Sequence, residues 1–183
     1  MGRLWSAVDE GDEGMAVELY IVRHAVAAPR DAGRWPDDSE RPLTREGEKK
    51  FARAARGLGR LVPEVGLVLS SPYARSWRTA ELLHSEAGWA APQWSVELAE
   101  GSRPAEVVSR LREQTRGAAL GSAAVVGHEP HLGELAAYLI SGNNTARLWF
   151  KKGGVARISL GNFEEPGVLR WLLTPKVLRS IEA

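Results

Sequence analysis

Residues 19–25 read L-Y-I-V-R-H-A, which is four apolar residues followed by an arginine, a histidine and an alanine. A short apolar run that ends at polar residues is typical of a buried strand. The sequence therefore predicts that residues 19–22 form a strand and that Arg23 and His24 stand at its carboxyl end. This strand is the first in a series along the chain.

Outward from this stretch, short apolar runs alternate with longer helical patterns. Strands are expected at residues 19–22, 67–69, 93–98, 123–126, 155–159 and 168–173. Helices are expected at residues 44–61, 74–87, 104–117 and 130–140, and a turn at residues 142–144. Thr44 is expected to cap the first helix, because its side chain can accept a backbone hydrogen bond there. Such alternation predicts an α/β fold with a mostly parallel central sheet flanked by helices.

Length and composition fit one domain. The chain has 183 residues, of which 44% are hydrophobic and 26% charged, and a chain of this length buries roughly 70% of its extended surface on folding. Residues 9–14 read D-E-G-D-E-G, a stretch too polar to pack. We therefore expect residues 1–15 to be a disordered extension and residues 16–183 to be a single domain.

Charge and hydropathy narrow the choice of partners. The net charge of +1 provides no general attraction for nucleic acid or for an anionic membrane. No apolar run is long enough to cross a bilayer, and the first residues lack the apolar stretch of a signal peptide. The chain contains no cysteine, which excludes disulfides and thiolate metal sites. These features favour a cytoplasmic protein with neither nucleic acid nor membrane as a partner.

Unusual polar residues follow three of the predicted strands. Arg23 and His24 follow the first, the segment S-S-P at 70–72 with Arg75 follows the second, and His128 follows the fourth. The carboxyl ends of parallel strands share one edge of a sheet, where binding crevices commonly form. Arginines present donors that match phosphate oxygens, and helix N-termini add backbone N–H groups. The sequence predicts an oxyanion site at this edge.

Four motifs occur in an order that resembles the histidine phosphatase superfamily. They are L-Y-I-V-R-H-A at 19–25, R-P-L-T-R-E-G at 41–47, S-S-P-Y-A-R-S-W-R-T-A at 70–80 and V-V-G-H-E-P at 125–130. Within that superfamily the chain is most similar to the SixA-type phosphohistidine phosphatases. It departs from the usual Arg-His-Gly triplet in having Ala25. The resemblance implies a three-layer, phosphoglycerate mutase-like fold.

The resemblance also implies roles for particular residues. His24 would accept the phosphoryl group as a nucleophile, with Arg23, Arg75 and His128 as further catalytic residues. Arg41 would bind the substrate phosphate. Water would then hydrolyse the phosphohistidine intermediate, with no metal and no other cofactor.

Glu100 is a further candidate residue of the predicted site. Larger relatives carry a glutamate after the third strand that protonates the leaving group, whereas SixA-type sequences tend to lack it. Glu100 lies near that position, so it is a possible general acid, and a solvated loop carboxylate is the alternative.

Two other functions compete with a phosphohistidine phosphatase. A small-molecule phosphomonoesterase or mutase of the same superfamily would share the core residues, so the substrate is either a phosphorylated protein or a small phosphorylated metabolite. A non-catalytic phosphate-binding module is the alternative from another class. The pair His128 and His131 could suggest a metal site, but arginines nearby would oppose a cation.

Overall fold

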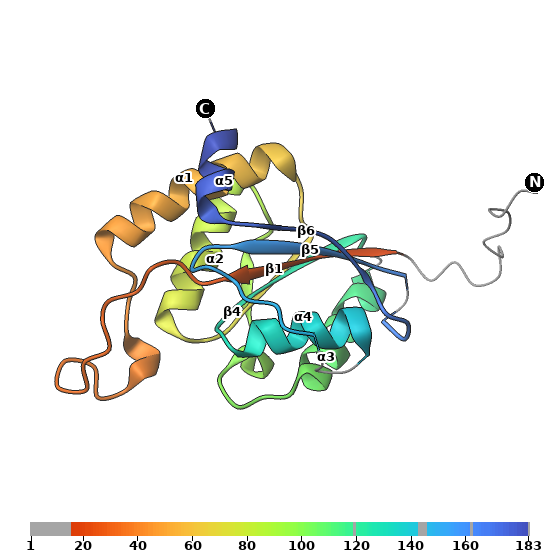
Figure 1. Ribbon diagram of the computed structural model, residues 1–183, viewed down its shortest axis with the longest axis horizontal. Coiled ribbons are helices and arrows are strands. Elements are labelled where there is room, and N and C mark those ends of the chain that lie inside the picture. The colour runs from red at the N-terminus through yellow and green to blue at the C-terminus, as the bar shows by residue number, and fades with distance from the viewer. Residues whose placement is uncertain (1–15, 119, 143–145, 162, 183) are drawn as a thin grey trace, which may run out of the picture.

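The computed structural model describes residues 16–118, 120–142, 146–161 and 163–182. Its strands form one six-stranded sheet in the order β3-β2-β4-β1-β5-β6 (Figure 1). The strands are β1 (Val17–Arg23), β2 (Leu67–Ser70), β3 (Pro92–Trp94), β4 (Ser122–Gly127), β5 (Val155–Leu160) and β6 (Val168–Leu173). The helices are α1 (Arg45–Leu61), α2 (Ala74–Ala87), α3 (Pro104–Ala118), α4 (His131–Ser141) and α5 (Pro175–Ile181), and two short 3-10 turns are η1 (Asp38–Glu40) and η2 (Val96–Leu98).

The sheet is mixed, and its parallel part consists of the strands β3, β2, β4 and β1. β1 pairs in parallel with β4, and β2 pairs in parallel with both β4 and β3. β5 pairs antiparallel with β1 and with β6. Three of these five pairings are therefore parallel, which confirms the predicted α/β fold with a mostly parallel sheet.

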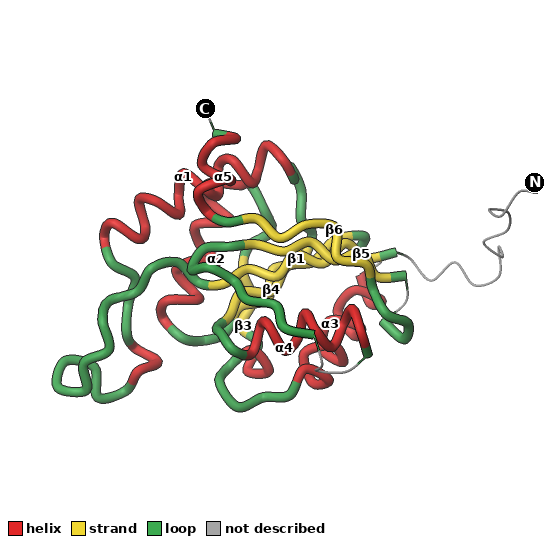
Figure 2. The backbone as a smooth tube through the Cα atoms, in the orientation of Figure 1, coloured by secondary structure: helices red, strands yellow, loops and turns green. Residues whose placement is uncertain are grey.

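Helices cover both faces of the sheet, so the molecule has three layers (Figure 2). Helices α1, α2 and α5 lie on one face, and α3 and α4 lie on the other. The residues of strand β1 point alternately toward the two faces of the sheet. Tyr20 and Val22 belong to the buried cluster under the first group of helices, whereas Leu19 and Ile21 belong to the cluster under the second. This alternation follows from the two-residue period of a strand.

Helix α1 forms where the sequence predicts it. The side chain of Thr44 accepts a hydrogen bond from the backbone N–H of Gly47 at 2.9 Å, a cap that typically contributes about 1 kcal/mol. Phe51, Ala54 and Leu58 are buried on one face of the helix, as the helical repeat requires.

Two parts of the fold differ from the prediction. The expected strand at residues 93–98 is shorter, because Ser95 N–H bonds to Ser70 O and the chain then turns into η2, which buries Leu98. Helix α5 was not predicted. It is seven residues long, too short to show a clear apolar period, and Thr174 caps it with Pro175 in its first turn.

Two of the sequence predictions lie outside the described residues. These are the disordered extension at residues 1–15 and most of the turn at residues 142–144, of which Gly142 is described as the left-handed C-cap of α4. Within the described part of the chain, no helix combines the length and the apolar character that a membrane span requires.

The parallel strands end at one level. Arg23, the last residue of β1, lies opposite Gly127 of β4, and Ser70 of β2 lies opposite Val126. The chain segments that leave these three strands therefore start side by side. The loop between β1 and α1 extends beyond this edge of the sheet (Figure 1).

Candidate active site

His24 is fixed directly after β1. Its backbone N–H donates to Gly127 O at 3.0 Å, and its ring Nδ1 lies 2.7 Å from Ala25 O. Because a carbonyl oxygen can only accept, Nδ1 must carry the ring proton and Nε2 keeps its lone pair. Burial lowers the pKa of His24 to about 3, and the nearby cations Arg75 and Arg23 act in the same direction. The imidazole is therefore neutral at physiological pH.

His128 stands beside it, directly after β4. The two ring centroids are 5.2 Å apart. Nε2 of His128 lies 2.8 Å from the Ser71 hydroxyl, whereas Nδ1 is buried with no hydrogen-bond partner in the part of the chain that the structure describes. Burial lowers the pKa of His128 to about 2, with a further contribution from His24.

Arg75 enters the site from the first turn of α2 and is 1% exposed. Its Nη1 donates to Asp38 O at 2.6 Å, and its Nη2 lies 2.9 Å from the Asp38 carboxylate and 3.4 Å from that of Glu100. Its Nε is buried and has no hydrogen-bond partner among the described residues. Two carboxyl groups, those of Asp38 and Glu100, therefore flank the guanidinium of Arg75.

Arg41 comes from the loop between β1 and α1 and is also buried. Its Nε donates to Asp38 Oδ1 at 2.8 Å, and its Nη1 donates to Ala28 O at 2.7 Å. Hydrogen bonding from Arg41 lowers the pKa of Asp38. Asp38 therefore bridges two arginines of the site as a carboxylate. Sequence reasoning missed this role, since Asp38 lies in a run of polar loop residues.

Arg23 is held by the segment that precedes β5. Its Nη1 donates to Phe150 O at 2.6 Å, and its guanidinium lies 5.3 Å from the ring of Trp149. The N–H of the same residue, Phe150, donates to Glu129 Oε1 at 2.7 Å. Burial raises the pKa of Glu129, while the Phe150 N–H and Arg23 act in the opposite direction. Glu129 and Arg23 are thus joined through one residue, a contact that sequence reasoning missed.

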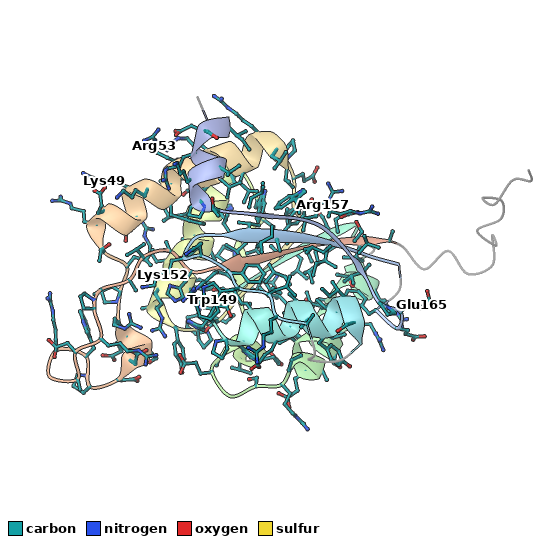
Figure 3. All side chains as sticks on the ribbon, in the orientation of Figure 1. Lys49, Arg53, Trp149, Lys152, Arg157 and Glu165 are labelled. Atoms are coloured by element: carbon teal, nitrogen blue, oxygen red, sulfur yellow. The ribbon has the colours of Figure 1, made fainter. Side chains whose placement is uncertain are left out.

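These side chains surround one hollow of about 430 Å³. All six residues singled out from the sequence line it, including Glu100, whose side chain is 48% exposed. Sequence reasoning missed three further charged residues that line the hollow, which are Arg30, Glu129 and Lys152. Figure 3 labels Lys152 and Trp149 at the left end of the sheet, where β1 ends.

The hollow suits an anion with several oxygen atoms. Five cationic side chains line it, beside the carboxyl groups of Glu100 and Glu129, and they are those of Arg23, Arg30, Arg41, Arg75 and Lys152. Arginine N–H groups fit phosphate oxygens in geometry and charge. In the described part of the chain, no group of three or more histidine, aspartate or glutamate residues is placed to hold a metal ion.

Comparisons with known proteins agree with this geometry. A family model described as the histidine phosphatase superfamily (branch 1) matches residues 19–102. An uncharacterized protein of Picosynechococcus is 32% identical over 145 residues, which are 79% of this chain and 86% of that protein.

Solved structures show the same fold. A structure of the protein histidine phosphatase SixA complexed with tungstate is 27% identical with a TM-score of 0.78, over 88% of this chain and 99% of that one. A putative phosphohistidine phosphatase SixA from Nakamurella multipartitia is 22% identical, with a TM-score of 0.72 over 90% of this chain and 99% of that one. A putative alpha-ribazole-5'-P phosphatase from Escherichia coli is 20% identical, with a TM-score of 0.64 over 87% and 97%. The last two matches show likeness of fold alone.

Proposed function

The chain belongs to the histidine phosphatase superfamily and is a phosphatase, and from this premise we propose that His24 is its phosphoryl-accepting nucleophile. The proposal rests above all on the hydrogen bond between His24 Nδ1 and Ala25 O. That bond fixes the tautomer in which Nε2 has its lone pair available for attack on phosphorus. The low pKa of His24 supports the proposal, because the ring stays unprotonated throughout the neutral range.

Arg23, Arg75 and Arg41 are proposed to hold the phosphoryl oxygens. The transition state of phosphoryl transfer spreads negative charge over three equatorial oxygens, so preorganised cations stabilise it more than they stabilise the substrate. His128 lines the same hollow. The N–H of a neutral imidazole there can donate a hydrogen bond to one of these oxygens. In the first step a bond forms between His24 Nε2 and phosphorus while the bond from phosphorus to the leaving group breaks, and the leaving group departs with that electron pair and a proton. Water then attacks phosphorus, the bond between phosphorus and His24 breaks, and inorganic phosphate leaves. No step requires a metal ion, and the surrounding arginines would repel one.

We propose phosphohistidine, and hence a phosphorylated protein, as the substrate. The likeness to the protein histidine phosphatase SixA at 27% identity supports this choice. A P–N bond to a protonatable imidazole breaks with little help, whereas an alkyl phosphate needs a general acid. We also propose that the enzyme works in the cytoplasm and that residues 16–183 act as one domain.

A small phosphorylated metabolite is the second candidate substrate. The observation that favours it is the position of Glu100, which lines the hollow 3.4 Å from Arg75 and is open to solvent. In that case we propose that the carboxyl group of Glu100 supplies the proton of the leaving oxygen.

One panel of substrates tests these proposals. Rates on phosphohistidine, phosphoramidate, a sugar phosphate and p-nitrophenyl phosphate are compared, with His24→Ala as the blank and with chelator added to a second series. We expect phosphohistidine to be the best substrate and the chelator to have no effect. Restoration of a chelated enzyme by zinc or magnesium would overturn the metal-independent mechanism.

Glu100→Gln separates the two substrate classes. If phosphohistidine is the substrate, its hydrolysis should change only a few-fold. If Glu100 acts as a general acid toward esters, hydrolysis of an alkyl phosphate should fall by ~10²-fold or more. Equal and severe losses on both substrates would contradict the assignment of phosphohistidine.

A further inference from the structure

The backbone around His24 is held by hydrogen bonds from two other segments of the chain. Gly153 N–H donates to the backbone oxygens of both Arg23 and His24, at 3.1 Å and 3.0 Å. His24 N–H donates to Gly127 O at 3.0 Å. These partners are backbone groups, so they place the residue without contacting its ring nitrogens. The orientation of the ring depends on the next residue, Ala25.

Ala25 orients the imidazole through its carbonyl group. That oxygen lies 2.7 Å from His24 Nδ1 and keeps the ring proton there. The side chain of Ala25 is a buried methyl group, which cannot fix the residue through a polar contact. Its backbone N–H instead donates to the hydroxyl of Thr79 at 3.0 Å. The carbonyl group that sets the tautomer of His24 therefore belongs to a residue that is held by a side chain of α2.

Thr79 lies in the second turn of α2 and is fully buried. Its hydroxyl donates to Arg75 O at 2.7 Å, one turn earlier in the same helix. Because a hydroxyl has a single proton, and Arg75 O receives it, the oxygen of Thr79 is left as an acceptor for the N–H of Ala25. The two hydrogen bonds thus join the backbone of Arg75 to the residue beside His24. Thr79 connects two residues that are proposed to act on the same phosphoryl group.

Helix α3 contains a buried threonine with the same contact to its own helix. Thr115 is 2% exposed, and its hydroxyl donates to Leu111 O at 2.9 Å, four residues earlier. Leu120 N–H donates to the backbone oxygen of Thr115 just before β4 begins. Thr115 therefore lies at the amino end of that strand, at the edge of the sheet opposite the site. It shares the intrahelical bond of Thr79 and lies far from His24.

We propose that Thr79 is a positioning residue for the nucleophile. Its hydroxyl holds Ala25 so that the ring proton of His24 stays on Nδ1 and the lone pair of Nε2 points at phosphorus. Without the hydroxyl, the N–H of Ala25 would be buried and unpaired, which backbone groups avoid by moving to another acceptor. Such a movement shifts the carbonyl group of Ala25 and with it the ring of His24. This inference rests on the proposed role of His24 as the nucleophile.

The experiment measures hydrolysis of p-nitrophenyl phosphate by Thr79→Val, Thr79→Ser and Thr115→Val. Valine has nearly the shape of threonine without the hydroxyl, so Thr79→Val should lower kcat about 10- to 100-fold, the effect of a misplaced reacting group. Inhibition by inorganic phosphate should change little, because Arg75 keeps its place in the first turn of α2. Thr79→Ser retains the hydroxyl and should recover most of the rate. Thr115→Val removes the matching hydroxyl of α3 and should leave kcat unchanged.

The tautomer of His24 provides a second readout, which a loss of stability alone would not change. NMR of the ring nitrogens should place the proton on Nδ1 in the wild type, in Thr79→Ser and in Thr115→Val. In Thr79→Val we expect a mixture of the two tautomers. Thr79→Ala removes the hydroxyl with a smaller side chain, and it replaces Thr79→Val in both measurements if that variant does not fold.

An unchanged kcat in Thr79→Val, or an equal loss of kcat in Thr79→Ser, would overturn the inference. Inhibition by phosphate that weakens as much as kcat falls would also overturn it, because Thr79 would then act through phosphate binding. The proposed function survives these results as long as the wild type forms a phosphoenzyme on His24 and His24→Ala is inactive. If the wild type forms no phosphoenzyme on His24 with any substrate, the proposed function itself is wrong.

Discussion

The middle of β1 and its carboxyl end differ in how well their buried groups are satisfied. Leu19 and Ile21 are fully buried among apolar side chains. A few residues further on, the Nε atom of Arg23 is buried without a hydrogen-bond partner in the described part of the chain, as are neighbouring atoms of Arg75 and His128. Such an unsatisfied group costs about 1–3 kcal/mol. The middle of the strand therefore contributes to stability, whereas its end loses stability at the proposed anion-binding site.

The largest expected effect lies in the middle of the strand. Leu19→Ala should lower the free energy of unfolding by about 2–5 kcal/mol, because the side chain is fully buried and leaves a cavity. Urea denaturation measures the loss. The activity of the fraction that remains folded should be close to that of the wild type. A large loss of activity per folded molecule would contradict the conclusion that the middle of β1 affects stability and not activity.

At the carboxyl end of β1, where Arg75 lines the same hollow, a substitution should lower kcat/KM. Arg75→Ala should lower kcat/KM by about 30- to 1,000-fold, which corresponds to ~2–4 kcal/mol of transition-state stabilisation. Arg78→Ala is the matched control, because Arg78 is on the same helix, is half-exposed, and pairs with Glu48 and Glu81 away from the hollow. Similar rates for the two variants would contradict a role for Arg75 in binding the phosphoryl group.

Acid should lower the free energy of unfolding through the two buried histidines of the site. An unfolded histidine takes up a proton near pH 6.5, whereas His24 and His128 have pKa values of about 3 and about 2 in the folded protein. Their cost to stability is therefore absent above pH 6.5 and grows as the pH falls, by about 1.4 kcal/mol per pH unit for each histidine. The free energy of unfolding, measured from pH 7 to pH 4, should fall less steeply in His128→Ala. An unchanged slope would show that His128 is already charged in the fold.

The smallest effect concerns the contact between Glu129 and Arg23. Glu129→Ala removes the acceptor for the backbone N–H of Phe150. The carbonyl oxygen of Phe150 in turn accepts a hydrogen bond from Arg23. We expect kcat/KM to fall roughly fivefold, in line with the ~1 kcal/mol that one hydrogen bond contributes. Glu129→Gln should recover part of the rate, because an amide oxygen can still accept that N–H. If the two variants are equally impaired, the contact does not position Arg23.

The position of the candidate site residues could be predicted from the sequence, because the ends of the strands can be identified from their apolar runs. The run at residues 19–22 and the one at 123–126 identify two strands, and parallel strands bring His24 and His128 to one edge. Thr44 likewise identified the start of α1. These predictions depend on backbone periodicity and capping, which are local.

The partners of the site residues could not be predicted in the same way. Asp38 and Glu129 act through the direction of their side chains, and sequence spacing does not determine that direction. Lys152 reaches the hollow because Gly153 N–H bonds to the backbone oxygens of both Arg23 and His24, a contact between segments more than a hundred residues apart. Such contacts follow from tertiary packing alone.

The most direct test of the account is to trap the phosphoenzyme. Wild type and His24→Ala are quenched during turnover of labelled substrate, and the labelled residue is mapped by mass spectrometry. We expect a label on His24 of the wild type that is lost in acid and stable in base. In His24→Ala we expect neither label nor turnover, and an unfolding temperature close to that of the wild type. An acid-stable label on Ser70 or Ser71, or turnover by His24→Ala above a few per cent of the wild-type rate, would contradict it.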